Sequence, residues 1–198
     1  MNIICWNCRG AGKAATVREL RDLAKQFAPT VLCVVETQIS ATRVEGLAST
    51  LGFDNGYAVS SNGRSGGIGM FWNNEINLEI LGYSEYHLDA KVSMANIPYW
   101  RLTCVYGEAQ TGERYKTWNT MKSLASTSTL PWTCMGDFNE VLRAEEHVGT
   151  GTRRPAQIGG FWDAVDVCGL VDLWYTGRSW TFEKKISGGA FSTMGRFY

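Results

Sequence analysis

Short apolar runs alternate with amphipathic segments along this chain, and this alternation restricts the possible folds more than any other feature. The run Val31–Val35 consists only of apolar residues, which is typical of a strand covered on both faces. The segment before it, Lys13–Ala28, repeats apolar residues at helical spacing, and Pro29 ends the predicted helix. A regular exchange of these two patterns predicts a layered α/β or α+β domain.

The same patterns predict further elements. We expect strands at Asn2–Asn7, Gly67–Trp72, Asn77–Tyr83, His87–Met94, Trp100–Tyr106 and Trp132–Met135. We expect helices from Ser40 to Gly52, at Thr111–Ser126 with Tyr115 and Trp118 facing inward, and at Gln157–Cys168. The chain has 198 residues, the length of one domain, so residues 1–198 are expected to form a single domain.

Charge and composition exclude several classes of protein. The chain has 19 Lys plus Arg and 19 Asp plus Glu, so its formal net charge is zero and any DNA contact is expected from a local patch. No apolar run approaches the ~20 residues that span a bilayer, which predicts no membrane partner. No signal-peptide pattern is visible, so we expect an intracellular protein that is not secreted, nuclear if it acts on chromosomal DNA.

The chain has six cysteines, which we expect to be free and mostly buried thiols. Cys5 and Cys8 form a C-x-x-C pair, but no second pair follows to complete a zinc site. Because side chains alternate along a strand, the two thiols are expected on opposite faces.

Four of the apolar strands run into polar residues. The strand ends are followed by Asn7, Glu36, Tyr106 and Asp137, and Asn139 comes two residues after Asp137. Ligand-contacting groups collect at strand ends and in the loops that follow them. Taken singly, each of these residues is more often a turn former or a cap. If the strand ends converge, the five side chains form one cluster of carboxylates, amides and a phenol.

Such a set of oxygen ligands suits Mg²⁺ or Mn²⁺ better than Zn²⁺. We expect Glu36 to be the main metal ligand, and Asp137 to orient or deprotonate a water molecule. Asn7 and Asn139 are expected to hydrogen-bond a phosphoryl oxygen or the nucleophile, and Tyr106 to stabilise developing charge. The corresponding reaction class is metal-assisted hydrolysis of a phosphoester.

Four motifs in this order resemble the endonuclease/exonuclease/phosphatase superfamily, the DNase I-like and AP-endonuclease-like group. They are WNCRG (Trp6–Gly10), VVET (Val34–Thr37), CVYGE (Cys104–Glu108) and MGDFNEVL (Met135–Leu142). The runs GDFNEVLRAEEHVG and GFWDAVDVCGLVDL resemble most the endonuclease domain of plant LINE-type, non-LTR retrotransposons. The resemblance covers essentially the whole chain.

The resemblance implies a four-layer α/β/β/α sandwich with two central, mainly antiparallel sheets and divalent-metal phosphodiesterase chemistry. By motif position it implies that Asn7 and Glu36 belong to the metal site. It matches Tyr106 to the tyrosine of the third motif, and Asp137 with Asn139 to the pair that positions and activates the attacking water.

The chain departs from the family pattern at its end. The family continues with Arg-Leu-Asp-Arg and a later Ser-Asp-His, whereas this chain ends MGRFY. We therefore expect a C-terminally truncated member that lacks its last strands and the catalytic Asp–His pair. General acid–base groups contribute about 10²–10⁴-fold in rate, so the activity is expected to be impaired.

Contacts with DNA are expected from a few basic and aromatic residues besides the five predicted site residues. Arg9, Arg153 and Arg154 are candidates for phosphate contacts, and Trp180 for stacking on a base. The alternative interpretation of Arg153 and Arg154 is a solvated basic loop without a role in binding. The alternative for Trp180 is packing in the core. The run GAGKA (Gly10–Ala14) hints at a phosphate-binding loop but lacks the first glycine and the Ser/Thr of that motif, so we expect a turn.

The function predicted from these observations is DNA nicking by a metal-dependent endonuclease of the retroelement type, with no protein partner indicated. Two alternatives stay open. The first is a non-catalytic retroelement remnant with weak or no nucleic-acid binding, and the second is a lipid or inositol phosphatase on the same scaffold.

Overall fold

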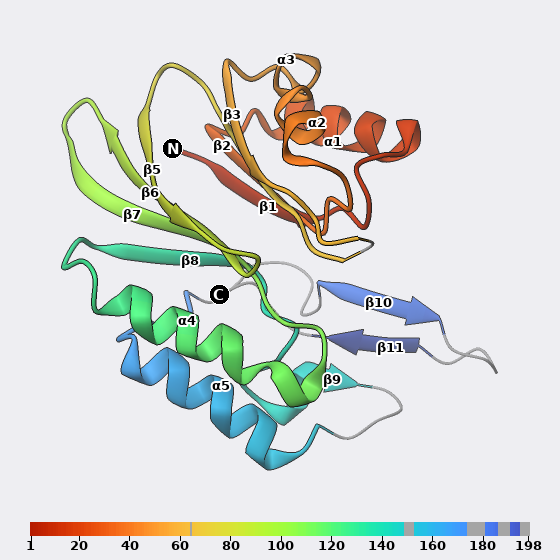
Figure 1. Ribbon diagram of the computed structural model, residues 1–198, viewed down its shortest axis with the longest axis vertical. Helices are drawn as coiled ribbons and strands as arrows, with labels where there is room; N and C mark the ends of the chain where they lie inside the picture. Colours follow the sequence, from red (N-terminus) through yellow and green to blue (C-terminus); the bar gives the residue numbers. More distant parts are fainter. Residues whose placement is uncertain (64, 149–152, 174–180, 186–190, 195–198) are drawn as a thin grey trace. The chain divides into compact units, whose positions relative to one another are not determined.

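The computed structural model describes residues 1–63, 65–148, 153–173, 181–185 and 191–194 (Figure 1). Close contacts divide the chain into two compact units. The first unit comprises Met1–Tyr106 and Leu130–Asp137, and the second comprises Gly107–Thr129 and Phe138–Tyr198. The expectation of a single domain over residues 1–198 stays a prediction.

The first unit contains two four-stranded sheets. The first sheet has the order β1 (Ile3–Asn7), β2 (Val31–Val35), β4 (Ile68–Trp72) and β3 (Asn55–Val59). Strands β1 and β2 are parallel, and the other neighbours are antiparallel. The apolar residues of β2 are all buried, as expected for a strand covered on both faces.

The second sheet has the order β5 (Asn77–Tyr83), β6 (His87–Met94), β7 (Ile97–Tyr106) and β8 (Trp132–Asp137). Here β7 and β8 are parallel, whereas β5, β6 and β7 form an antiparallel meander. Each sheet therefore holds one parallel pair, and in each pair both strands end at the same edge of their sheet.

Three helices of the first unit, α1 (Ala14–Phe27), α2 (Ala41–Glu45) and α3 (Ala48–Leu51), cover one face of the first sheet (Figure 1). Between these helices and the sheet lies one apolar core, which includes Leu20 and Phe71. The other face of the same sheet packs on the second sheet through residues such as Met70 and Leu102. Burial of each large apolar side chain contributes about 1.5–3 kcal/mol, so these two cores hold the layers together.

The second unit is built around two helices, α4 (Tyr115–Ala125) and α5 (Pro155–Val167). They pack through Trp118 and Phe161, whose ring centroids are 4.5 Å apart. The unit also contains the 3₁₀ turns η1 (Thr111–Glu113) and η2 (Ala144–Glu146), and a small sheet of β10 (Phe182–Lys185), β11 (Phe191–Met194) and β9 (His147–Val148).

The structure confirms the predicted α/β sandwich class with two mainly antiparallel sheets. It corrects two details. The helix predicted from Ser40 to Gly52 is interrupted at Gly46 and forms two short helices, because glycine is a poor helix former. Tyr115, predicted to face inward, is 52% exposed at the first turn of α4. Within the described residues, no helix is long and apolar enough to cross a membrane.

Candidate active site

Asn7 and Asp137, predicted from the ends of two different strands, are in direct contact. The Nδ2 group of Asn7 donates a hydrogen bond of 2.8 Å to Oδ2 of Asp137. Asn7 ends β1 in one sheet and Asp137 ends β8 in the other, so the contact joins the two sheets. The Oδ1 atom of Asn7 accepts a hydrogen bond from the backbone N–H of Arg9 (3.1 Å), which fixes the orientation of the amide.

Glu36 lies directly beyond the end of β2, beside Asn7. In the parallel register Asn7 is opposite Val35, the residue before Glu36. The Oε1 atom of Glu36 accepts a hydrogen bond of 2.9 Å from Nε2 of Gln38, and its carbonyl oxygen accepts one of 2.8 Å from the N–H of Gly10. The loops after β1 and β2 are thus tied together around a half-buried carboxylate.

Tyr106 ends β7 and is the register partner of Asp137 in the parallel pair. Its side chain is buried, with 8% exposed, and its N–H donates to the carbonyl of Tyr86 (2.9 Å). Four of the predicted residues therefore lie at or directly after strand ends of the first unit: Asn7, Glu36, Tyr106 and Asp137.

The glycine before Asp137 explains part of the GDFN motif. Gly136 has φ +150°, and a Cβ atom built there would lie 1.9 Å from the carbonyl oxygen of Val105. Only a residue without a side chain lets β8 approach β7 this closely. Gly136 thereby brings Asp137 into register with Tyr106.

Asn139 belongs to the second unit and contacts the backbone. Its Nδ2 group donates a hydrogen bond of 2.6 Å to the carbonyl oxygen of Gly107. Its φ of 54° lies in the left-handed region, which asparagine tolerates better than most residues. This contact holds the segment that follows Tyr106, which is the role of a turn former that the sequence also allowed.

Three of the predicted site residues have left-handed backbone conformations although they are not glycine. They are Arg9 (φ 46°), Glu36 (φ 59°) and Asn139 (φ 54°). Such conformations cost about 1–3 kcal/mol each and gather at functional sites, where the surrounding structure enforces them. At Glu36, hydrogen bonds from Gly10 and Gln38 hold the residue in this conformation directly after the end of β2.

The donor set fits a hard divalent cation. Mg²⁺ takes one or two carboxylates and completes its shell with water and phosphate oxygens. Glu36 supplies a carboxylate and Asn7 an amide oxygen, and the carboxylate of Asp137 is bonded to the Asn7 amide. Within the described residues, no group of three or more His, Cys, Asp or Glu side chains that could hold a metal ion is found.

The C-x-x-C pair is structural, as expected. Cys5 lies in the core between the two sheets, 3.9 Å (Sγ to Sγ) from Cys104, whereas Cys8 lies in the core beneath the helices. Burial raises the pKa of Cys8 to about 11. Both thiols are therefore protonated at neutral pH and separated by the sheet.

The predicted DNA-contact residues have different surroundings. Arg9 is exposed in the loop after β1. In the second unit, Nε of Arg153 lies 3.4 Å from Oε1 of Glu140, and burial lowers the pKa of Arg153. The N–H of Arg154 donates to Oε1 of Gln157 (3.0 Å) at the start of α5. Trp180 lies outside the described residues.

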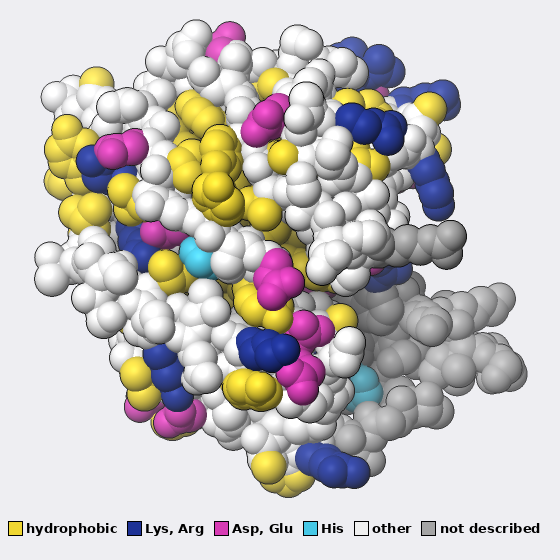
Figure 2. Space-filling model, viewed as in Figure 1, with side chains coloured by type: hydrophobic (Ala, Val, Ile, Leu, Met, Phe, Trp, Pro, Cys, Tyr) yellow, Lys and Arg dark blue, Asp and Glu magenta, His cyan; other side chains and the backbone are white. Residues whose placement is uncertain are grey.

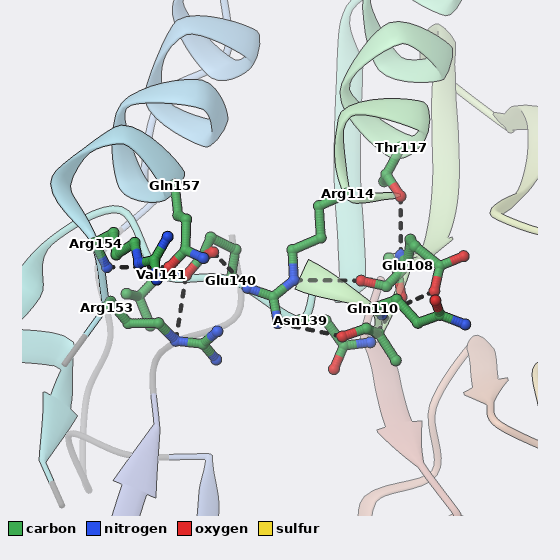
Figure 3. A network of polar contacts seen from close by, with 12 residues as sticks. Glu108, Gln110, Arg114, Thr117, Asn139, Glu140, Val141, Arg153, Arg154 and Gln157 are labelled. Carbon is green, nitrogen blue, oxygen red and sulfur yellow. Dashed lines mark hydrogen bonds and ion pairs between the residues drawn. The ribbon is translucent and has the colours of Figure 1, made fainter. Parts of the chain in front are cut away.

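A buried ion pair beside Arg153 was not predicted. Nη1 of Arg114 lies 2.5 Å from Oε2 of Glu140, and both side chains are almost completely buried (Figure 3). Figure 3 shows Glu140 between Arg114 and Arg153, so one carboxylate is shared by two guanidinium groups. Glu140 directly follows Asn139 in the GDFNE run, but its partner lies 26 residues away, and no local pattern reveals it.

Several solved structures share the fold described above. The chain is similar in fold to the AP endonuclease LMAP from Leishmania major, with TM-score 0.68 and 17% identity over 97% of this chain and 78% of that chain. It is similar to an AP endonuclease from Archaeoglobus fulgidus, with TM-score 0.62 and 14% identity over 84% of this chain and 71% of that chain. It is also similar to the endonuclease domain of TRAS1, a telomere-specific non-LTR retrotransposon, with TM-score 0.67 and 11% identity over 98% of this chain and 82% of that chain.

No curated protein matches the chain in sequence. The model of the endonuclease/exonuclease/phosphatase family matches residues 4–189, which include all four motifs and the strand ends described above. The chain therefore belongs to the endonuclease/exonuclease/phosphatase family.

Proposed function

We propose that this protein is a divalent-metal-dependent phosphodiesterase of the DNA endonuclease type, related to the retroelement enzymes that nick target DNA. The hydrogen bond between Asn7 and Asp137 carries this proposal, because it joins the ends of β1 and β8 beside Glu36 and Tyr106. The similarity in fold to AP endonucleases and to the TRAS1 domain supports phosphodiester hydrolysis as the reaction. The sequence resemblance to plant LINE elements favours the retroelement type among these nucleases.

The residues divide into metal ligands and groups that act on the attacking water. Glu36 and Asn7 would hold Mg²⁺ or Mn²⁺, which when bound polarises a phosphoryl oxygen and offsets the charge of the transition state. Asp137 accepts a proton from the attacking water while the water oxygen bonds to phosphorus. The bond from phosphorus to the leaving oxygen breaks, and the leaving oxygen takes up a proton from solvent. The Asn7 amide orients that carboxylate by donating to its Oδ2.

Tyr106 and Asn139 act on the substrate in this proposal. The phenol of Tyr106 donates a hydrogen bond to the phosphoryl oxygens where charge develops. The ring of Tyr106 is buried and its residue pairs with Asp137, so the position of the phenol is fixed. The amide of Asn139 would hydrogen-bond the phosphoryl group or the nucleophile. Its contact with Gly107 shows that it also orders the segment after Tyr106.

Nicking of supercoiled plasmid DNA tests the proposal. Because we expect the activity to be impaired, we expect at most slow relaxation of the plasmid with Mg²⁺ or Mn²⁺ and none with EDTA. Glu36→Gln and Asp137→Asn each keep the size of the side chain but remove its charge, so each is expected to lower the rate by about 10²-fold or more. Glu75→Gln and Asp22→Asn change exposed carboxylates outside the site and serve as controls.

The outcomes separate the alternatives. Nicking that survives in both Glu36→Gln and Asp137→Asn contradicts the proposed site. Hydrolysis of a phosphoinositide panel without nicking favours the phosphatase alternative, and the lack of metal binding in a titration favours the non-catalytic remnant. Strong nicking by this chain that is lost in the two variants contradicts the expected impairment and supports the site.

A further inference from the structure

Three arginines line a pocket of the first unit that plays no part in the proposed chemistry. The pocket has a volume of about 480 Å³. Arg18 and Arg21 reach it from α1, and Arg43 from α2, while Val17, Ile39 and Leu47 are among its apolar lining. The lining includes no Asp or Glu. We call it the arginine pocket, and its net charge favours an anion.

The charges of the arginine pocket are not neutralised within the part of the chain that the structure describes. None of Arg18, Arg21 and Arg43 takes part in the ion pairs found among the described residues. The Nε atom of Arg21 is shielded from solvent and has no hydrogen-bond partner there. A buried donor without a partner costs about 1–3 kcal/mol, which a bound acceptor removes.

The N-terminus of α1 adds positive potential at the same place. Gly12 and Ala14 line the pocket at the start of this helix of 14 residues. Its first turn has no acidic residue, and Lys13 at the N-cap makes no side-chain capping hydrogen bond. The helix dipole therefore acts in the same direction as the three guanidinium groups. In Figure 2, Lys and Arg side chains gather in the region where Figure 1 draws α1.

The glycine-rich run before α1 does not itself cradle a phosphate. The N–H of Gly10 donates to the carbonyl of Glu36, and the N–H of Ala11 donates to the carbonyl of Thr37, each at 2.8 Å. These amides are used to join two loops, as expected for a turn. A ligand of the arginine pocket is therefore held by side chains and the helix terminus.

We propose that the arginine pocket binds a phosphoryl group, and that this group is a backbone phosphate of the nucleic acid being cleaved. Arginine is suited to phosphate because its planar group donates two parallel hydrogen bonds. The second part rests on the proposed function. The assignment to nucleic acid is supported by the position of the pocket. Ala11 lines the pocket, and its hydrogen bond to Thr37 links the segment after Asn7 to the segment after Glu36, so the pocket adjoins the loops of the proposed site.

Binding measured without cleavage tests this proposal separately from the nuclease activity. A labelled single-stranded oligonucleotide is titrated in EDTA and followed by fluorescence anisotropy at several salt concentrations. We expect Arg18→Gln/Arg43→Gln to weaken binding about 5–10-fold and to lower the slope of log K against log salt by about 1, as for one lost phosphate contact. Both arginines are exposed, so the variant is expected to fold.

A matched control and a charge-conserving variant sharpen the test. Lys25→Gln/Lys91→Gln removes two charges of the first unit outside the pocket and is expected to change binding less than about 2-fold, since Lys25 is exposed and screened by salt and Lys91 is already paired with Glu79. Arg21→Lys keeps the charge but removes Nε, so it is expected to weaken binding, because an ammonium group cannot replace the directional hydrogen bonds of a guanidinium. An equal loss of oligonucleotide affinity in the two double variants would overturn the proposal, because it would show that binding depends on overall charge and not on the arginine pocket.

Inorganic pyrophosphate identifies the source of the phosphoryl group. In EDTA it is expected to raise the thermal midpoint of the wild-type protein and of Glu36→Gln, but not of Arg18→Gln/Arg43→Gln. If pyrophosphate shows this pattern while oligonucleotide binding is equal in all variants, the nucleic-acid assignment is overturned. If oligonucleotide binding depends on the pocket but no plasmid is nicked, the pocket is supported and the proposed nuclease function fails.

Discussion

Glu36 combines a proposed chemical role with a conformational cost. Its φ of 59° is unfavourable for any residue with a Cβ atom, and the cost is of the order of 1–2 kcal/mol. The sequence predicted the carboxylate from its place after an apolar strand. It did not predict the left-handed backbone, which depends on the bonds between the loops around Gly10 and Gln38.

Two substitutions at Glu36 separate these contributions. Glu36→Ala and Glu36→Gly both remove the carboxylate, so both are expected to abolish nicking. Glycine adopts φ near +60° without strain, so Glu36→Gly is expected to be more stable than Glu36→Ala by about 1 kcal/mol in urea unfolding. Equal stability of the two variants would show that the backbone at this position relaxes when the side chain is removed.

Cys8 makes stability depend on alkaline pH. Its pKa is about 11 in the folded protein against an ordinary value of 9.0, because burial disfavours the thiolate. The folded state therefore keeps its proton at a pH where the unfolded chain has lost it. The contribution is complete below pH 9.0 and is lost as the pH rises to about 11, and it amounts to about 2–3 kcal/mol at most.

Urea unfolding of the reduced protein between pH 8 and 11 measures this effect. We expect the wild-type free energy of unfolding to fall more steeply across this range than that of Cys8→Ala. The alanine variant loses packing and is expected to be less stable at pH 8, so the readout is the slope and not the absolute stability. Parallel curves for the two proteins would contradict a raised pKa at Cys8.

At the scale of elements, the buried ion pair in the second unit sets the geometry between α4 and the loop after β8. Arg114 precedes α4 and Glu140 follows Asn139, and the side chains are 9% and 0% exposed. Breaking a buried pair leaves an uncompensated charge and costs about 3–5 kcal/mol. The pair therefore constrains the segment that carries Asn139.

Arg114→Met is expected to lower the free energy of unfolding by about 3 kcal/mol, the lower end for a broken buried pair, because Arg153 still contacts Glu140. Arg114→Met/Glu140→Gln is expected to recover part of that loss because no buried carboxylate is left without its main partner. Lys116→Met is the matched control, since it breaks the exposed pair with Glu113 and is expected to cost less than about 1 kcal/mol. If the double variant is no more stable than Arg114→Met, the loss does not come from an uncompensated charge.

Elements with strong local signals were predictable from the sequence, and those that depend on distant partners were not. The apolar run of β2 was predicted with its observed bounds. Strand β3 was missed because its residues, NGYAV, alternate weakly and begin with turn formers. The break at Gly46 was missed because the apolar spacing from Val44 to Leu51 continues across it.

At the scale of the whole molecule, four strand ends could be predicted to converge, but their contacts could not. The sequence places Asn7 and Asp137 130 residues apart, and only the packing of the two sheets against each other, with β1 next to β8, brings them together. The arginine pocket illustrates the same limit, since Arg43 joins Arg18 and Arg21 only when α2 packs near α1. Patterns within one element are local, whereas a site combines several elements.

The hydrogen bond between Asn7 and Asp137 has a consequence for how this protein tolerates change. Its two ends are carried by different sheets, so the thickness of the apolar layer that includes Met70, Leu88 and Leu102 sets the distance between the two proposed site residues. A substitution deep in that layer that shifts one sheet by a fraction of an ångström would misalign the carboxylate without touching it. The proposed activity is thus expected to be sensitive to side chains outside the site, and an alteration of the interior is expected to abolish it while the chain still folds.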